Sequence, residues 1–255
     1  MTVKFRDITL VPITAELYMA ISCDVSASIG EKPDDVLCVS TKVTGAYCAR
    51  VALMELLALG AKPQALIHTV GNEFNPTGKL SLEGIREELS RAGYNHIEIN
   101  GSSEENMDTS MTAIGVTLLG SIRKDSFKVR CQAVEKGDSL YVVGSPLVGR
   151  AVIERPREIV PYEAVSAMVH SSCVRDVLPV GSRGISGEMD TLLMGTSLRC
   201  HYLPEWEHSA MLTQSGGPAT SVLVVVHQGQ DDTFKAEMQS IYPMVRKLGT
   251  LSVEE

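Results

Sequence analysis

The sequence lacks a membrane-spanning stretch, because its 255 residues contain no run of about 18 uncharged apolar residues. It also lacks the apolar core of a secretion signal, since its first residues are Met-Thr-Val-Lys-Phe-Arg-Asp. From these two absences we expect a cytoplasmic protein.

Paired metal-binding spacings are absent as well. The six cysteines form no Cys-x-x-Cys pair and the six histidines no His-x-x-x-His pair, so the sequence indicates neither a zinc site nor a dithiol redox centre. Most of the cysteines lie in apolar stretches, where we expect reduced thiols packed in the core. The cysteines are Cys23, Cys38, Cys48, Cys131, Cys173 and Cys200.

An excess of positive charge is missing too. The chain has 23 Lys and Arg against 31 Asp and Glu, which gives a net charge of −8. Nucleic acids and anionic membranes are bound through basic surfaces that replace counterions, so we expect neither partner. The negative charge does not exclude ATP, because a bound Mg²⁺ screens the triphosphate locally.

Two glycine-rich segments do not match the known nucleotide fingerprints. Six residues separate Gly71 from Gly78 where a Walker A loop has four, and Leu80 replaces the required Ser or Thr. We expect this segment to turn into a helix that starts near Gly78. Residues 181–187 lack the Gly-x-Gly pair of a dinucleotide loop. They form either an ordinary turn or an anion-binding helix start beside Arg183.

Strand and helix patterns alternate along the chain, which predicts a mixed α/β architecture. A polar break at residues 122–125 divides it into candidate domains 1–124 and 125–255. In the first domain we expect strands at 16–25, 36–40, 64–70, 96–99 and 111–119 and helices at 43–59 and 80–92. In the second we expect strands at 138–144 and 221–226, helices at 162–171 and 185–194, and a largely apolar segment at 174–180. Residues 248–255 are expected to fray.

The helix expected at 43–59 is apolar on nearly all sides, yet it contains Glu55. An unpaired buried carboxylate costs several kcal/mol. Arg50, the other charge in this helix, lies about 140° away around the axis and cannot easily pair with it. The partner of Glu55 is therefore either a tertiary salt bridge or a bound cation.

Other acids follow strands or fill loops. Asp24 lies at the end of the strand expected at 16–25, and residues 100–108 form an acidic loop after a short β-branched run. Such residues favour solvated turns, but carboxylate clusters also suit hard cations such as Mg²⁺.

Several segments together resemble the aminoimidazole-ribonucleotide synthetase superfamily, which includes thiamine-monophosphate kinase, selenophosphate synthetase and hydrogenase maturation factors. They are residues 6–12, 22–35, 59–63 and 101–106, and, for the second domain, 174–188 and 215–223. The opening segment and the loop Gly-Ser-Ser-Glu-Glu-Asn are most similar to the α-ribazole kinase branch. The resemblance implies a two-domain fold in which the first domains of two subunits pair in a β-barrel, hence a homodimer.

The resemblance also implies an ATP-binding first domain with Mg²⁺ on the phosphates. The implied Mg²⁺ ligands are Asp24, Asp35, Glu55 and Glu104. The further nucleotide contacts are Gly101 and Asn106. Many members have Asp where this chain has Glu55, and the longer side chain favours ligation through water.

The implied reaction is phosphoryl transfer from ATP to a small riboside, most specifically of α-ribazole to its 5′-phosphate in cobalamin biosynthesis. Such a reaction needs in-line placement and cation stabilisation more than a special nucleophile. Asp24 or Asp108 could take the hydroxyl proton, and Lys32 could offset phosphate charge or simply be solvated. Another synthetase of the superfamily and a non-catalytic nucleotide-binding homologue remain open.

The second domain is expected to bind the acceptor. Its turn-rich segments can present backbone N–H groups to a polar riboside, and Glu188 either binds that riboside or faces solvent on a first helical turn. The candidate acceptor-binding residues are Gly181, Arg183, Gly184, Glu188 and Gly217.

Overall fold

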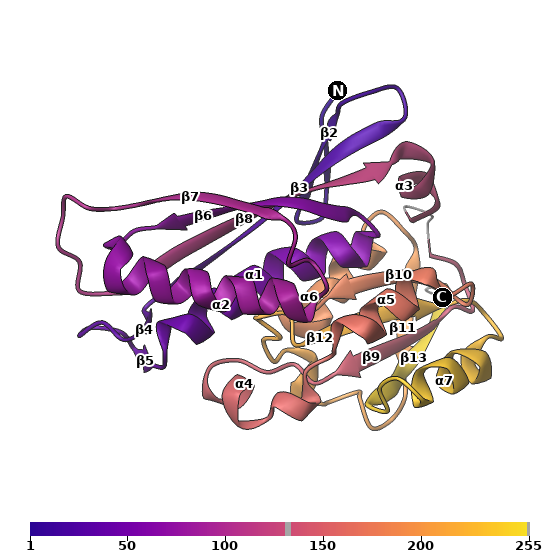
Figure 1. Ribbon diagram of the computed structural model, residues 1–255. Coiled ribbons are helices and arrows are strands. Elements are labelled where there is room, and N and C mark those ends of the chain that lie inside the picture. Colours follow the sequence, from indigo (N-terminus) through magenta and orange to yellow (C-terminus); the bar gives the residue numbers. More distant parts are fainter. Residues whose placement is uncertain (131–133, 254–255) are drawn as a thin grey trace. The chain divides into compact units, whose positions relative to one another are not determined.

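The computed structural model describes residues 1–130 and 134–253, and the chain forms two compact units, Met1–Lys124 and Asp125–Glu255 (Figure 1). The boundary lies within the polar break at residues 122–125. Each unit contains its own sheet. In the part of the chain that the structure describes, no helix combines the length and the apolar character needed to cross a bilayer.

Unit 1 is built on a six-stranded sheet. Across the sheet the strands are β1 (Val3–Phe5), β2 (Ile8–Pro12), β3 (Leu17–Ala27), β8 (Ala113–Arg123), β6 (Lys62–Val70) and β7 (Glu98–Ser103). Neighbouring strands are antiparallel except β6 and β7, which are parallel. The short strands β4 (Ile29–Gly30) and β5 (Leu37–Cys38) form a separate parallel pair.

Helices α1 (Thr41–Leu59) and α2 (Lys79–Arg91) lie side by side along this sheet, and α1 packs on β3, β6 and β8 (Figure 1). Burial therefore alternates along β8: Leu118 is buried towards the helices, whereas Leu119 is only half-buried. Because successive strand residues point to opposite faces, one face of the sheet carries the core of unit 1 and the other has no helix of unit 1 upon it.

Two glycines allow α1 and α2 to approach closely. A Cβ on Gly84 would lie 1.8 Å from the Lys42 carbonyl oxygen, and one on Gly45 would lie 2.2 Å from the Ser81 carbonyl oxygen. Any larger residue at either position would push the helices apart. The helix after the false Walker A segment begins at Lys79, directly after a π-helical turn at Phe74–Gly78, which confirms the expected start near Gly78.

Unit 2 contains a five-stranded antiparallel sheet. Its strands in spatial order are β10 (Val174–Pro179), β12 (Ser221–Val226), β9 (Ser139–Gly144), β13 (Val245–Val253) and β11 (Leu198–Tyr202). Its helices are α4 (Arg150–Glu154), α5 (Tyr162–His170), α6 (Gly184–Leu193) and α7 (Asp231–Gln239), and α3 (Lys124–Arg130) begins at the unit boundary. Short 3₁₀ turns occupy Pro156–Glu158 and Ala210–Leu212.

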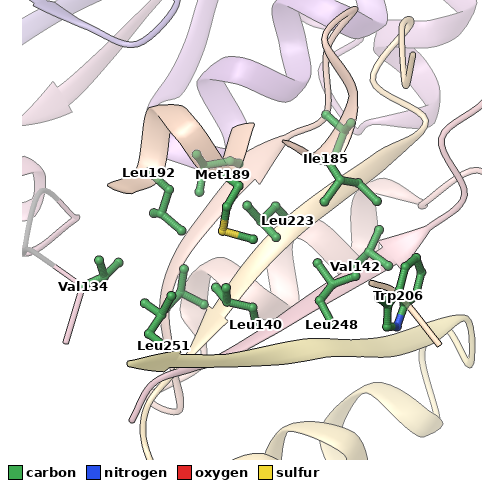
Figure 2. Close-up of a cluster of buried hydrophobic side chains, with 13 residues drawn as sticks. Val134, Leu140, Val142, Ile185, Met189, Leu192, Trp206, Leu223, Leu248 and Leu251 are labelled. Carbon is green, nitrogen blue, oxygen red and sulfur yellow. The ribbon is translucent and has the colours of Figure 1, made fainter. Parts of the chain in front are cut away.

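Unit 2 covers both faces of its sheet with its own residues. On one face Met189 of α6 and Trp206 pack with Leu223 and Leu248 in a buried cluster (Figure 2). On another side Tyr141 of β9 stacks edge-on against Phe234 of α7, with ring centroids 4.9 Å apart. Strands β9, β10 and β12 are consequently buried at every position.

The expected fraying of residues 248–255 was wrong. Residues 245–253 form β13, which pairs with β9 and β11, and Leu248 and Leu251 are buried. The partners of this strand come from distant parts of the sequence, so its own pattern did not reveal it. Residues 254–255 lie outside the described residues. The strand expected at 111–119 also continues to Arg123.

The cysteines agree only in part with the expectation of core thiols. Cys48 and Cys173 are buried, Cys200 is intermediate, and Cys23 and Cys38 are exposed. These five are free thiols. Cys131 lies outside the described residues.

Candidate functional site

A pocket of about 450 Å³ opens at one end of the unit 1 sheet, where β6 and β7 end and β8 begins. Its lining combines apolar, very small and hydroxyl side chains with one carboxylate. The lining residues are Val25, Thr69, Val70, Gly71, Ser102, Ser103, Glu104, Ala113, Ile114 and Gly115.

Close strand contacts explain two glycines at this end of the sheet. A Cβ on Gly115 would lie 2.5 Å from the Thr69 hydroxyl oxygen, and one on Gly101 would lie 2.0 Å from the His68 carbonyl oxygen. Gly115 therefore leaves the pocket wall free of a side chain, whereas Gly101 lets β7 approach β6. Gly101 is exposed, is part of β7 and is not among the pocket-lining residues.

Glu104 brings a negative charge to the pocket. Its backbone N–H donates to the carbonyl oxygens of Val70 and Asn72, at 3.0 Å in each case. Its Oε1 accepts from the backbone N–H groups of Asn106 at 2.7 Å and Met107 at 3.2 Å. The hydrogen bonds from Asn106, followed by the weaker one from Met107, lower the pKa of Glu104, so the carboxylate is ionised at neutral pH.

Lys32 and Asp35, which the resemblance placed at the phosphates, fasten loops in this structure. Lys32 Nζ lies 2.7 Å from Glu73 Oε2 and donates to the Thr109 carbonyl oxygen at 3.1 Å. Asp35 is buried and accepts from the Lys32 backbone N–H at 2.9 Å. It also accepts from the Thr112 N–H at 2.8 Å and the Thr112 hydroxyl at 2.7 Å. Despite its burial, these bonds and the charge of Lys32 lower the pKa of Asp35.

Asp24 of β3 and Glu55 of α1 lie at different positions along the axis of α1, because Asp24 is beside Cys48. The Cys48 thiol approaches the Asp24 carbonyl oxygen at 3.6 Å, and burial raises the pKa of Asp24 to about 6. Glu55 follows Cys48 by seven residues, which is about 10 Å along a helix axis. Asp24 is on β3 and the Glu104 loop follows β7. Two strands, β8 and β6, lie between them, so the two sites are three strand spacings or about 14 Å apart across the sheet.

The predicted acids are thus not gathered into one cluster. Among residues 1–130 and 134–253, no three His, Cys, Asp or Glu side chains come together as potential metal ligands. Asp108 and Asn106 are exposed in the same acidic loop as Glu104. The roles of Asp24, Asp35, Glu55 and Glu104 at a metal stay predictions.

The deeply buried charge of α1 is Arg50 rather than Glu55, which is half-buried. The Arg50 and Glu88 side chains are 5% and 4% exposed, and Arg50 Nη1 lies 3.6 Å from Glu88 Oε1. Glu88 also pairs with Arg91 at 3.0 Å. The sequence pattern did not show which of the two charges in this helix is the more deeply buried, because a continuous apolar run does not reveal which face of a helix meets solvent. A tertiary salt bridge or a bound cation as the partner of Glu55 stays a prediction.

In unit 2 the predicted acceptor segments meet one another. The Gly181 carbonyl oxygen accepts from the backbone N–H of Gly184 at 3.1 Å and of Gly216 at 3.0 Å, which joins residues 181–184 to the 214–220 loop. The Gly181 N–H donates to Glu188 Oε1 at 3.3 Å. Glu188 is half-buried and bends back on the loop that precedes α6.

Arg183 and Gly217 flank the same junction. Arg183 is the N-cap residue of α6, and its Nη2 donates to the Thr191 hydroxyl at 3.0 Å. The Gly217 N–H donates to the Ser215 hydroxyl at 3.3 Å. Gly184 has a φ of +71°, and a Cβ there would lie 2.8 Å from the carbonyl oxygens of Leu212 and Gln214, so glycine is required.

The sequence analysis missed most of the pocket lining. Thr69 and Gly115 lie inside strands and carry no motif of their own, whereas Ser102 and Ser103 belong to the Gly-Ser-Ser-Glu-Glu-Asn segment. The one available signal was the acidic loop, which supplied Glu104. The segment that starts at Gly71 was rejected as a Walker A loop, correctly, but it contributes Gly71 to the pocket.

No family model and no curated protein sequence matches this chain. Solved structures do. PurL from T. maritima in complex with AMPPCP is similar with a TM-score of 0.67 and 15% identity, covering 96% of this chain and 42% of PurL. Thiamine monophosphate kinase from Aquifex aeolicus gives a TM-score of 0.66 and 14% identity, covering 98% of this chain and 89% of the kinase.

The hydrogenase maturation protein HypE in complex with ATP is also similar, with a TM-score of 0.62 and 12% identity over 95% of this chain and 78% of HypE. The chain spans less than half the length of PurL. These likenesses show that the chain has the mixed α/β fold typical of aminoimidazole-ribonucleotide synthetase and its structural relatives.

Proposed function

We propose that this protein binds ATP in the pocket of unit 1 and transfers a phosphoryl group to a hydroxyl of a small riboside. The observation that carries the proposal is the pocket itself, where the Glu104 carboxylate lies beside the hydroxyls of Ser102 and Ser103. The shared fold supports it, because PurL was solved with AMPPCP and HypE with ATP.

The pocket has the lining that a nucleotide needs. Val25 and Ala113 offer apolar surface to a flat base, and the hydroxyls of Thr69 and Ser102 can bond to ribose and phosphate oxygens. Its volume of about 450 Å³ is within the usual range for small-molecule sites, about 300–1,000 Å³.

We assign Glu104 to a Mg²⁺ ion on the phosphates. Such an ion takes one or two protein carboxylates and completes its coordination with phosphate oxygens and water. A single carboxylate at the pocket is therefore enough, and no cluster of three protein ligands is needed, in agreement with the described residues. When bound, Mg²⁺ would neutralise charge on the transferred group. Asp24, Asp35 and Glu55 are proposed to contribute through water or through the loops that they hold.

Further residues of unit 1 are proposed to take part in the transfer. Lys32 could exchange its partner Glu73 for a phosphate oxygen, which would bring a positive charge to the site. Asp24 and Asp108 are the candidate bases for the acceptor hydroxyl, and the raised pKa of Asp24 favours Asp24. Gly101 and Asn106 are proposed to contact the nucleotide through the backbone of β7 and of the acidic loop.

Unit 2 is proposed to bind the acceptor where residues 181–188 meet the 214–220 loop. The hydrogen bonds from Gly181 to Glu188 and from Gly216 to Gly181 give this region a fixed shape. Its contacts to the acceptor would come from Arg183, Gly184, Glu188 and Gly217. α-Ribazole is the acceptor that the sequence resemblance favours, and the likeness to a thiamine monophosphate kinase supports a kinase.

The second candidate is an ATP-using synthetase, which the likeness to PurL favours. A homodimer is proposed as well. Within unit 1, Met19, Ile21 and Leu119 lie half-buried and Val25 lies exposed on the sheet face opposite α1, so a second copy could cover apolar surface there.

Calorimetric titration with AMPPCP, with and without Mg²⁺, tests the nucleotide site. We expect Mg²⁺-dependent binding that Glu104→Gln weakens about tenfold and that Glu83→Gln, an exposed change on α2, leaves unaltered. Phosphorylation assays should then compare α-ribazole, thiamine monophosphate and formylglycinamidine-type acceptors. A parent protein that does not bind AMPPCP would refute the proposal.

A further inference from the structure

In the structure, residues 100–103 of the expected acidic loop belong to β7, so from here on the acidic loop means residues 104–112, between β7 and β8. Asn72 is completely buried and touches both ends of this loop. Its backbone carbonyl oxygen accepts from the Glu104 N–H at 3.0 Å, where the loop begins. Its Nδ2 donates to the Thr109 hydroxyl oxygen at 2.5 Å and to the Met111 carbonyl oxygen at 2.7 Å, where the loop ends. Its Oδ1 accepts from the N–H of Ala113, the first residue of β8, at 2.8 Å.

The side chain of Asn72 is fully used by these contacts. A primary amide has two N–H donors, and both meet acceptors here, while the amide oxygen meets a backbone donor. Aspartate has the same shape but no donor, so it would place a negative oxygen against the Met111 carbonyl. Only an amide of this length satisfies all three groups.

Other contacts also hold the loop. At its beginning, the Glu104 N–H also donates to the Val70 carbonyl oxygen, and Glu105 Oε1 accepts from the Phe74 N–H at 2.8 Å. At its end, Lys32 donates to the Thr109 carbonyl oxygen, and Asp35 accepts from Thr112. Asn72 is the residue that joins this fixed end to Glu104. It does not itself line the pocket, so any effect on a ligand must act through the loop.

We propose that Asn72 is a positioning residue of the nucleotide site: by closing the acidic loop, it holds the Glu104 carboxylate at the pocket. This inference rests on the proposed function for the identity of the ligand, but the loop contacts can be tested without any ligand.

The test compares Asn72→Asp with Asn95→Asp, the same chemical change in an exposed turn before β7. Amide hydrogen exchange, measured without nucleotide, should accelerate about tenfold at Asn106, Met107 and Ala113 in Asn72→Asp. Exchange in α1 and α2 should stay at the parent rate. Asn95→Asp should match the parent throughout.

Binding of AMPPCP supplies a second readout, which a purely structural role would not move selectively. In Mg²⁺, Asn72→Asp should lose about tenfold in affinity, because the carboxylate that meets the ion is displaced. In EDTA, parent and variant should bind equally.

Thr109→Val provides a milder variant if Asn72→Asp does not fold. It removes one acceptor of the Asn72 amide and should produce the same pattern with about a threefold change. Unchanged exchange in residues 104–113 overturns the inference, as does accelerated exchange with unchanged Mg²⁺-dependent affinity. A parent protein that fails to bind AMPPCP overturns the proposed function instead, and the exchange data still decide whether Asn72 holds the loop.

Discussion

The two sheets of this protein differ in how their own units cover them. In unit 1 both helices pack on one face, and burial alternates along β8. In unit 2 the strands β9, β10 and β12 are buried at every position. The cluster around Trp206 packs on one side of β9, and Phe234 of α7 packs on Tyr141 of the same strand. A half-covered sheet can offer a binding surface on its strands, whereas a fully covered one must bind through loops at strand and helix ends.

This contrast matches the two proposed sites. The nucleotide pocket of unit 1 is lined largely by strand residues such as Thr69, Ser102 and Gly115. The proposed acceptor residues of unit 2 lie at the start of α6 and in the 214–220 loop.

The largest expected effects concern the buried ion pairs, one in each unit. Arg175 Nε lies 2.8 Å from Asp138 Oδ2 in unit 2, a shorter contact than the 3.6 Å between Arg50 and Glu88 in unit 1. Glu88→Gln removes the carboxylate beside Arg50 and should lower the free energy of unfolding by about 3–5 kcal/mol. Asp138→Asn should cost less, because Arg175 keeps a second ion pair with Glu135 at 3.0 Å.

Urea denaturation can assign the loss to a unit, because the single tryptophan, Trp206, lies in the core of unit 2. If the units unfold separately, Asp138→Asn should lower the urea midpoint that is measured by tryptophan fluorescence. Glu88→Gln should lower only the midpoint that is measured by circular dichroism. Equal stability of both variants and the parent would show that neither pair is buried in solution.

Leucine truncation tests the covered and uncovered faces directly. Leu118 and Leu119 are neighbours on β8, and only Leu118 is fully buried. Leu118→Ala, like Leu223→Ala in unit 2, should cost about 2–5 kcal/mol, and Leu119→Ala about 1 kcal/mol or less. A cost for Leu119→Ala that equals that for Leu118→Ala, and that grows with protein concentration, would show that a second copy covers the face.

A smaller effect separates nucleotide from acceptor binding. Glu188→Gln should raise the KM of the acceptor or lower kcat and leave AMPPCP affinity unchanged, whereas Asp24→Asn should weaken Mg²⁺-ATP binding. Steady-state kinetics with titrated acceptor and AMPPCP calorimetry measure both. Parent-like kinetics in Glu188→Gln would move the acceptor away from α6.

The smallest effect is a dependence of stability on pH. Burial raises the pKa of Asp24 from 3.8 to about 6, so between these values the folded state binds more protons than the unfolded chain. The stabilising contribution is complete below about pH 4 and is lost as the pH rises through about 6. Asp24→Asn should therefore gain stability relative to the parent above about pH 6 and differ less below about pH 4.

Melting temperatures across this range measure the difference. Burial lowers the pKa of His68 to about 4, so its contribution has the opposite sign and is lost as the pH falls from 6.5. Because His68 is present in both proteins, the difference between parent and variant isolates Asp24. A difference that does not change with pH would contradict the assigned pKa.

The sequence predicted the elements whose signal is local. Residues 222–226 are a continuous apolar run, and the structure places β12 there. The long apolar run at 43–59 corresponds closely to α1. By contrast, β13 contains Arg246, Lys247 and a register shift, so only its pairing with β9 and β11 makes it a strand.

The site was less predictable for a similar reason. Glu104 could be found because it belongs to a recognisable loop. Asn72 could not, because its importance lies in three hydrogen bonds to residues about 40 positions away, which no spacing in the sequence displays. For Lys32 the sequence left a phosphate contact and a solvated side chain both open, and its ion pair with Glu73 depends on how two loops fold together.

In each unit the strand that comes last in the sequence lies inside the sheet rather than at its edge: β8 lies between β3 and β6, and β13 between β9 and β11. During translation, earlier strands leave the ribosome first, but neither sheet can form all of its strand pairs until this last strand emerges. Until then each nascent unit exposes two unpaired strand edges, which are sites for chaperone binding or for aggregation. The growing chain thus passes through two separate vulnerable intervals, one ending once Arg123 has emerged and the other once Val253 has.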